Sequence, residues 1–492
     1  MLRLGVNSSY TADLVLLVLV LFAISHVYRT LKRPISQVPG PWVSKWTDIV
    51  VTYYWLTGRR AKYVHGLHQK YGPVVRVSPY EVDFSDIAVT KEVYSVKEVY
   101  LKSSFYTKVI PRSTISIFNV NDVNLHRRYR RLLSNNMSES SLKSMYPVIE
   151  AKVSLAIQNM RDEMQKRGAT DVFKWWLFMA TDIIGELTFG ESFCMLEQKK
   201  KNQYIVDLES ADAIGALRST FPTLSYISGF LPLPIFRRAA DATRGIIRYG
   251  EESLARHARL ELVDPANSKT TLFRKMYKAE EDEQLSFKEI LDNAMTYIIA
   301  GSDTTSNTLT YLTWAVCRHP SVKAALLKEL ATLPIDGFGD QELKELPYLN
   351  AVIEETLRLY GAAPSSLPRD VPPGGAYLAG YWLGEGTTVS SQAYTLHRDP
   401  ETFPQPEIFD PSRWETPTKA MKDAMFAFGG GARICIGIHL ARMELRLAVA
   451  RFFRAFPDAK ISKLEGMSDG DMEQKIYFLS SPTGKRCLVE AH

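Results

Sequence analysis

The hydrophobic positions of the chain begin with a continuous apolar run near the N-terminus. Leu14 to Ile24 contains no polar residue, and the largely apolar span from Ala12 to Tyr28 reaches the lower limit of about 17 residues for a helix that crosses a bilayer. Three basic residues follow between positions 29 and 33, and no small-residue cleavage site does. By the positive-inside rule we expect residues 1–33 to form an uncleaved, single-pass membrane anchor, with the rest of the chain in the cytosol.

The segments around this anchor carry signals of their own. Asn7 opens an Asn-Ser-Ser sequon, which would lie on the lumenal side and could carry a glycan. The proline-rich stretch from Val38 to Trp42 predicts a stiff connector between anchor and globule. Tyr226 to Phe236 is a second apolar stretch, broken by prolines. It is either a loop folded onto the core or a patch that dips into the bilayer interface.

The remaining pattern predicts a mainly helical globule over residues 34–492, with a minor antiparallel β portion. Residues 71–84 alternate apolar and polar positions about a Ser-Pro turn, which predicts a hairpin. Ser286 and Glu289 form a capping box that opens a long apolar helix running to about Arg318. Other expected elements are short strands around residues 365–392, a helix over Asn350 to Leu359, and a last helix from about Ile438 to Phe456.

Composition narrows the possible classes of function. The formal net charge of +6 is spread along the chain without a basic block, so we expect no nucleic-acid partner. The four cysteines are far apart and form no CxxC or zinc-type spacing, which favours a reducing compartment over a disulfide framework. Cys435 is therefore a lone thiol, and its role must be inferred from the residues around it in the sequence.

Cys435 lies in a glycine-rich stretch, FGGGARICIG, from Phe428 to Gly437. A bound metal cation deprotonates a thiol, and the amides at the start of the following helix would stabilise the negative charge. Glycines such as Gly431 and Gly437 would let the backbone approach a flat macrocycle, and Arg433 could pair with a carboxylate of that macrocycle. The alternative is a buried structural cysteine in a glycine-rich turn.

This stretch resembles the cysteine loop of the cytochrome P-450 superfamily, whose pattern FxxGxRxCxG it matches at every position. The resemblance implies the cytochrome P-450 fold, haem b as cofactor, and Cys435 as the axial ligand of the haem iron. It also implies that Phe428, Gly431, Arg433 and Gly437 contribute to cofactor binding. The resemblance extends from about residue 34 to the end of the chain.

A second match to the superfamily, AGSDTT from Ala300 to Thr305, lies inside the long apolar helix. Glycine costs a helix about 1 kcal/mol relative to alanine, and polar side chains in an apolar helix need partners. The presence of these residues in the helix therefore indicates a functional role. The family motif A/G-G-x-D/E-T-T implies that Ala300 leaves room beside the haem, that Thr304 hydrogen-bonds dioxygen, and that Asp303 relays protons. The alternative is a kinked helix whose threonines bond back to its own backbone.

An ExxR sequence supplies a third match through Glu355 and Arg358, which stand three residues apart on a helix. Arg413 lies in a segment, FDPSRW, that matches the later FxPxRW pattern. The resemblance implies that these three residues form a buried triad behind the haem, with a structural rather than a catalytic role. Such a cluster is costly unless it is complete.

Basic residues elsewhere in the chain match positions that face the haem propionates. His126 and Arg130 are four residues apart on one helix, and the family often has Trp or His at the first of these positions. Arg369, eleven residues after Arg358, matches a third such position. The resemblance therefore implies that His126, Arg130 and Arg369 bind the cofactor.

The resemblance implies a monooxygenase that uses O2 to oxidise a hydrophobic small molecule. The chain ends soon after the cysteine loop, so NADPH-derived electrons are expected from a separate NADPH–cytochrome P-450 reductase in the endoplasmic reticulum membrane. The sequence, including the segment HRRYRRLLS, resembles the sequences of fungal enzymes of secondary metabolism. By family position, the substrate pocket is expected to include Ile117, Phe118, Tyr297, Ser366 and Phe478.

Two rival functions share the same cofactor. One is a haem-thiolate isomerase or dehydratase that acts without O2; such relatives usually lack the acid–alcohol pair that Asp303 and Thr304 provide here. The other is a non-catalytic, membrane-anchored haem-binding protein, which would need neither that pair nor a supply of electrons. Oxygen uptake in the presence of reductase and NADPH separates the three functions.

Overall fold

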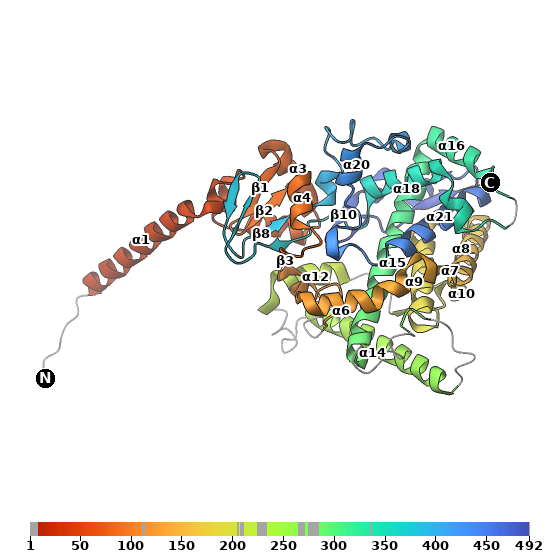
Figure 1. Ribbon diagram of the computed structural model, residues 1–492, viewed down its shortest axis with the longest axis horizontal. Coiled ribbons are helices and arrows are strands. Elements are labelled where there is room, and N and C mark those ends of the chain that lie inside the picture. The colour runs from red at the N-terminus through yellow and green to blue at the C-terminus, as the bar shows by residue number, and fades with distance from the viewer. Residues whose placement is uncertain are drawn as a thin grey trace.

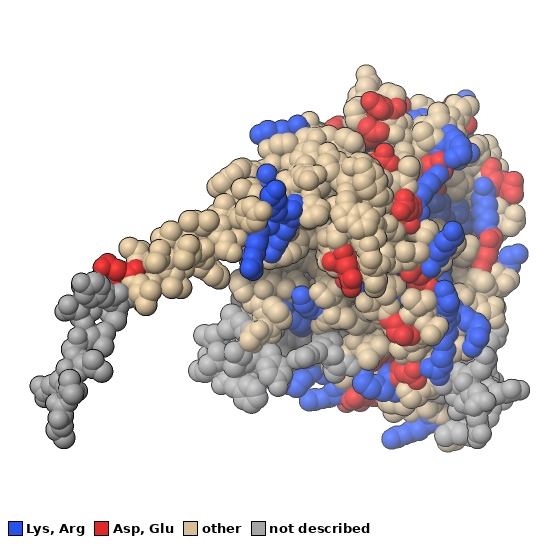
Figure 2. Space-filling view, turned by 60° about the vertical axis from the view of Figure 1, so that its left-hand side comes forward, with Lys and Arg blue, Asp and Glu red and all other residues tan. Residues whose placement is uncertain are grey.

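A computed structural model describes residues 8–110, 114–203, 206, 211–223, 234–263, 271–273, 285–334 and 337–491. A single helix, α1 (Ser8–Lys32), projects from the globule that the rest of the chain forms (Figure 1). Among the described residues, Asp13–Lys32 is the span long and apolar enough to cross a membrane, a test that a signal sequence also passes. Figure 2 shows this helix almost free of charge between its two ends, whereas acidic and basic side chains intermingle on the globule.

Helices make up most of the globule, as the sequence pattern predicts. Their bounds are α2 Ile49–Leu56, α3 Arg60–Tyr71, α4 Ile87–Val93, α5 Phe105–Val109, α6 Val123–Ser134, α7 Glu139–Lys143, α8 Tyr146–Arg167, α9 Val172–Phe189, α10 Met195–Gln198, α12 Ala211–Thr220, α14 Pro234–Val263, α15 Phe287–Arg318, α16 Pro320–Leu330, α17 Asp340–Lys344, α18 Pro347–Tyr360, α19 Ala393–Leu396, α20 Lys419–Ala424 and α21 Ile438–Ala455. The long apolar helix, the helix around residue 355 and the last helix are all confirmed, as is the capping box of Ser286 and Glu289.

The strands form small sheets beside the helical part. Their bounds are β1 Val74–Ser78, β2 Glu81–Phe84, β3 Leu101–Lys102, β4 Thr170–Asp171, β5 Arg369–Asp370, β6 Ala376–Leu378, β7 Tyr381–Leu383, β8 Thr388–Ser390, β9 Lys460–Ile461, β10 Gln474–Ile476, β11 Ser480–Pro482 and β12 Leu488–Glu490. The predicted hairpin is β1–β2, and it joins a five-stranded sheet of order β1-β2-β8-β5-β3. The pairing of β2 with β8 is parallel, so this sheet is mixed and not purely antiparallel.

Helix α15 runs through the middle of the globule and packs against α9, α18 and α21 (Figure 1). Helix α9 is buried almost throughout, which is why its sequence is apolar on every side. Gly301 lets the two helices meet closely: a Cβ at this position would lie 2.8 Å from Ile184 Cγ1 of α9. The mid-helix glycine therefore has a packing role that the sequence alone does not reveal.

The connector after α1 is tied to the sheet by a buried arginine. Arg76 of β1 donates from its guanidinium to the carbonyls of Val38 at 2.5 Å and Pro41 at 3.1 Å, and its amide donates to Pro39 O at 2.7 Å. Val38 has an extended backbone, and Pro41 O also accepts from Ser44 N at 3.1 Å, at the start of a 3-10 turn over Trp42–Lys45. The predicted stiff connector is thus also held by hydrogen bonds to the globule.

Candidate active site

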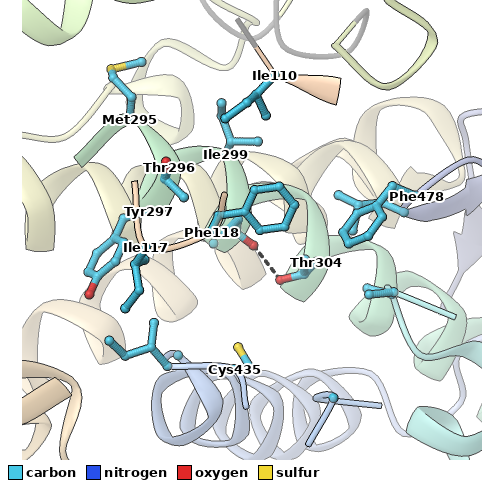
Figure 3. A pocket seen from close by; sticks show the side chains of 18 of the residues that line it. Ile110, Ile117, Phe118, Met295, Thr296, Tyr297, Ile299, Thr304, Cys435 and Phe478 are labelled. Carbon is cyan, nitrogen blue, oxygen red and sulfur yellow. Dashed lines mark hydrogen bonds between the residues drawn. The ribbon is translucent and has the colours of Figure 1, made fainter. Parts of the chain in front are cut away.

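A largely apolar cavity of about 800 Å³ lies between α15, α6, α12 and the loop before α21. Figure 3 shows Cys435 at one end of it, with Thr304 of α15 facing the space above the sulfur. At the opposite end lie Ile110, Met295 and Thr296. Because a pocket of this kind has apolar walls and a few polar groups, it suits a hydrophobic small molecule.

The loop that carries Cys435 is fixed by its own backbone. The amide of Cys435 donates to Phe428 O at 2.9 Å, and a short 3-10 turn over Gly431–Arg433 separates the two residues. Cys435 is open to the cavity but enclosed by the protein, and this enclosure raises the pKa of its thiol, while a backbone hydrogen bond from Gly437 and the charge of Arg130 oppose the rise. The sulfur therefore needs a cation, such as a metal ion, to become a thiolate at neutral pH.

Two glycines of this loop have different physical roles. Gly431 has φ +62°, and a Cβ on it would lie 1.9 Å from Tyr94 O and 2.7 Å from Ser95 O. The backbone at Tyr94 and Ser95 thus leaves no room for a side chain at this position, a reason for the glycine that the sequence analysis did not give. A Cβ at Gly437 would have Cys435 Sγ as its nearest neighbour, at 3.9 Å, so this glycine does keep the surroundings of the sulfur open.

Arg433 points one unpaired donor at the cavity that it lines. Its Nε donates to Glu98 Oε1 at 2.6 Å and its Nη1 to Val120 O at 2.7 Å. The buried Nη2 has no hydrogen-bond partner among the described residues. Buried donors are almost always paired in folded proteins. Arg433 is therefore suited to a bound acceptor, such as a carboxylate of a cofactor.

The other predicted basic residues line the same cavity. Arg130 donates to Ile434 O at 2.5 Å, and Arg369 donates to the hydroxyl of Tyr106 at 3.0 Å. Burial, together with neighbouring cations led by Arg433, lowers the pKa of His126 to about 3, so its imidazole is neutral near pH 7. A neutral His126 can donate a hydrogen bond but adds no positive charge.

Lys102 of β3 is a further cation at this site that the sequence analysis missed. Its ammonium group donates to Phe118 O, and burial followed by repulsion from Arg369 and Arg433 lowers its pKa well below the ordinary range. It also lies 4.9 Å above the Phe118 ring. No local motif marks Lys102, because only the pairing of β3 with β5 brings it beside Arg369.

The middle of α15 supplies a hydroxyl group to the cavity. Thr304 Oγ1 donates to Ala300 O at 2.6 Å, and both residues line the cavity (Figure 3). This is the back-bonded arrangement that the sequence analysis held as the alternative, in a residue that also faces the space above Cys435. Asp303 is half-buried and is not among the residues that line the cavity.

Glu444 of α21 is a buried acid that the sequence analysis also missed. It lines the cavity, is 2% exposed, and shares a hydrogen bond with the side chain of Thr305. Burial raises its pKa to about 8, and the bond to Thr305 only partly offsets this effect. Its carboxyl group is therefore mainly protonated at neutral pH and holds a proton beside α15.

Glu355, Arg358 and Arg413 meet behind the cysteine loop, as the resemblance implied. Arg358 forms a bidentate salt bridge with Glu355, in which its Nε and Nη2 each donate to one carboxylate oxygen at 2.8 Å. Arg413 Nε donates to Glu355 Oε1 at 3.0 Å. Trp414 Nε1 and the amide of Asp410 also donate to this carboxylate. The side chains of Glu355 and Arg358 are fully buried, and Arg413, which is 9% exposed, links them to the segment before the cysteine loop.

The predicted substrate-pocket residues do not all reach the cavity. Ile117, Phe118 and Phe478 line it, and so does Tyr297, whose buried hydroxyl has no hydrogen-bond partner within the described part of the chain. Ser366 does not: its hydroxyl donates to the buried carboxylate of Asp83 at 3.1 Å, which places it in the sheet. Residues 111–113, Asn7 of the sequon and most of the apolar stretch at 226–236 lie outside the described residues.

Comparisons with known proteins agree with this geometry. A family model described as cytochrome P450 matches residues 39–484. The chain is 45% identical over 487 residues to cytochrome P450 monooxygenase tazI of Aspergillus terreus, with 99% of each chain covered. It is 43% identical to cytochrome P450 monooxygenase orf2 of Aspergillus niger, with 96% of each covered, and 35% identical to cytochrome P450 monooxygenase cypX of Dothistroma septosporum, with 99% of this chain and 96% of the relative covered.

Proposed function

The chain belongs to the cytochrome P450 family, and we propose that it is a haem-thiolate monooxygenase acting on a hydrophobic intermediate of fungal secondary metabolism. The observation that carries this proposal is the lone thiol of Cys435 at one end of an apolar cavity, opposite the hydroxyl of Thr304. Haem b, when bound, supplies an iron at which O2 is activated with electrons from a partner protein. The remaining steps concern this chain's own residues.

The residues around Cys435 fit a haem group by their chemistry. Cys435 would ligate the haem iron, Gly437 and Ala300 would leave room for the ring, and Phe428 would contact it. The unpaired Nη2 of Arg433 and the side chains of Arg130, Arg369 and Lys102 would pair with the two propionates, with neutral His126 as a further donor. Gly431 would act indirectly, by fixing the loop.

Thr304 and Asp303 are the proposed catalytic residues. The hydroxyl of Thr304 now donates to Ala300 O, and a rotation about its Cα–Cβ bond would turn the same proton toward the cavity. Asp303, one residue earlier on α15, would replace that proton from the side of the helix away from the cavity. The triad of Glu355, Arg358 and Arg413 would hold the cysteine loop and take no part in the chemistry.

The electrons would come from NADPH through NADPH–cytochrome P-450 reductase. We propose that residues 1–33 anchor the chain in the endoplasmic reticulum membrane and that residues 34–492 form the cytosolic monooxygenase domain. The exposed apolar side chains of α1 support this arrangement, because burying them in a bilayer removes them from water.

The test is reconstitution of the full chain with haem, reductase and NADPH. We expect a thiolate-type absorption band from the reduced carbonyl complex, and NADPH-dependent oxygen uptake with an extract of the producing cells. Cys435→Ala should lose the band, whereas Cys317→Ala, a cysteine of α15 distant from the loop in sequence, should keep it. Turnover of peroxides without NADPH would favour the isomerase, and haem binding without either activity would favour the non-catalytic function.

A further inference from the structure

Arg218 of α12 lines the cavity at the end opposite Cys435. Its Nη1 donates to Val109 O at 3.3 Å, and the next residue, Ile110, lies at the far end of the cavity from the sulfur (Figure 3). In the part of the chain that the structure describes, Arg218 forms no ion pair. Its guanidinium group therefore has several N–H donors without an acceptor among the described residues.

Two of the other charged groups of the cavity are paired, and one further acid, Glu251 of α14, also lines it. Lys288 pairs with Asp292 at 2.6 Å, and Arg433 pairs with Glu98. Burial lowers the pKa of Arg218, and no charged group among the described residues contributes to this shift. A half-buried cation is costly unless an anion accompanies it, so Arg218 has the properties of a residue that receives its anion from a ligand.

The position of Arg218 is set by the backbone. Gly215, one turn earlier, lets α12 approach α5 so closely that a Cβ there would lie 3.1 Å from both Val109 Cγ2 and Val109 O. On the same helix, Ser219 Oγ accepts a hydrogen bond from Trp55 Nε1 at 3.2 Å. These two contacts fix the helix on both sides of Arg218 and hold its side chain at the cavity.

Aromatic rings form the wall between Arg218 and the space near Thr304. Phe118 and Phe478 meet edge to face at 5.5 Å, and Tyr106 meets Phe118 in the same way at 5.4 Å. Trp55 lines the cavity beside α12. Ring edges and faces of this kind favour contact with a flat, conjugated molecule.

We propose that the substrate is a flat hydrophobic molecule with one anionic oxygen, a carboxylate or an acidic enol, and that Arg218 binds this oxygen at the end of the cavity opposite Cys435. The apolar body of the molecule then extends along the aromatic wall toward Thr304. This inference rests on the proposed function and adds the substrate class and the residue that selects it. Arg218 contacts the substrate without contacting the reacting atoms, so it acts as a specificity residue.

The experiment compares a charged probe with its neutral isostere. The full-length, haem-loaded protein in detergent micelles is titrated at pH 7.5 with biphenyl-4-carboxylate and with biphenyl-4-carboxamide, and dissociation constants are measured by calorimetry. We expect the carboxylate to bind about tenfold to a hundredfold more tightly, the range for a hydrogen bond to a charged group. Arg218→Gln should remove this preference, Arg218→Lys should keep part of it, and Arg244→Gln, on the exposed surface of α14, should keep all of it.

Three measurements decide whether the inference holds: the carboxamide affinity, the preference for the carboxylate, and the reduced carbonyl spectrum. Unchanged carboxamide affinity in Arg218→Gln shows that the cavity is folded, so a lost preference for the carboxylate then supports the inference. Equal binding of both probes by the wild-type protein, or an undiminished preference in Arg218→Gln, overturns it. The reduced carbonyl spectrum separates this result from the proposed function: a normal thiolate band with no preference for charge defeats only the inference, and a charge preference without the band defeats only the function.

Discussion

Replacing Glu444 with glutamine should remove a pH dependence of stability that this buried carboxyl group imposes. The side chain is 2% exposed, and its pKa rises from the ordinary 4.5 to about 8, chiefly because of burial. Glutamine has nearly the same shape and keeps a partner for the side chain of Thr305, but it has no proton to lose. The substitution therefore isolates the ionisation of one group.

The sign of the effect follows from where the proton is bound. Below pH 4.5 both the folded and the unfolded chain hold it, and the group does not change the free energy of unfolding. Between pH 4.5 and about 8 the unfolded chain releases the proton while the folded chain retains it, so the free energy of unfolding falls by about 1.4 kcal/mol per pH unit. The interval spans about 3.5 pH units, which gives a total loss of about 5 kcal/mol by pH 8.

Urea unfolding of the full-length holoprotein in micelles, followed by tryptophan fluorescence from pH 5 to pH 8.5, measures this loss. We expect Glu444→Gln to match the wild-type protein near pH 5 and to become progressively more stable than it up to pH 8. Glu354→Gln on α18 serves as a control, because its carboxylate is partly exposed and pairs with Arg442 at the surface. A difference between wild type and Glu444→Gln that stays constant with pH would refute the assignment of a buried, protonated acid.

Three further substitutions test the site. Arg358→Met should lower the free energy of unfolding by about 3–5 kcal/mol, because it leaves the buried carboxylate of Glu355 without its main partner; a loss below about 1 kcal/mol in urea unfolding would contradict this. Gly431→Ala should abolish haem incorporation measured by absorbance, since left-handed backbone alone costs alanine about 1–2 kcal/mol and its Cβ also collides with backbone, whereas Gly430→Ala, with φ −154°, should be tolerated. Thr304→Val should use NADPH with less product and more released peroxide, and fully coupled turnover would exclude its hydroxyl from proton delivery.

Elements with strong local signals were predictable from the sequence. The capping box of Ser286 and Glu289 fixes the start of α15, and the alternation over residues 71–84 fixes the β1–β2 hairpin, because both depend on neighbours only a few residues apart. The parallel pairing of β2 with β8 was not predictable, since it joins segments about 300 residues apart through backbone bonds that leave no sequence pattern. The hydrogen bonds from Arg76 to the connector were not predictable for the same reason, because they also join residues that are distant in sequence.

The residues of the candidate site also divide into those that local motifs predict and those that only the fold brings to the cavity. Cys435, Thr304 and the Glu355 triad stand in dense local motifs; the structure places Cys435 and Thr304 at one cavity and joins Glu355 to Arg358 and Arg413. Lys102 and Glu444 have no motif, and only the packing of β3 against β5 and of α21 against α15 places them at the cavity. Buried ionisable residues of this kind are recognised from the groups that surround them in space, and the sequence alone does not show those groups.

Charge balance gives an argument for the cofactor that does not depend on the cysteine. Arg369, Arg433 and Lys102 repel one another in a buried region, and Glu98 is the acid that offsets them there. A folded protein retains such an excess of positive charge only where an anion is bound, because the desolvated cations would otherwise lose their charge or leave the interior. Two carboxylates, such as the propionates of the proposed haem b, would offset much of this excess of positive charge. Arg218, at the opposite end of the cavity, stands outside that cluster, and the same reasoning assigns its anion to the substrate.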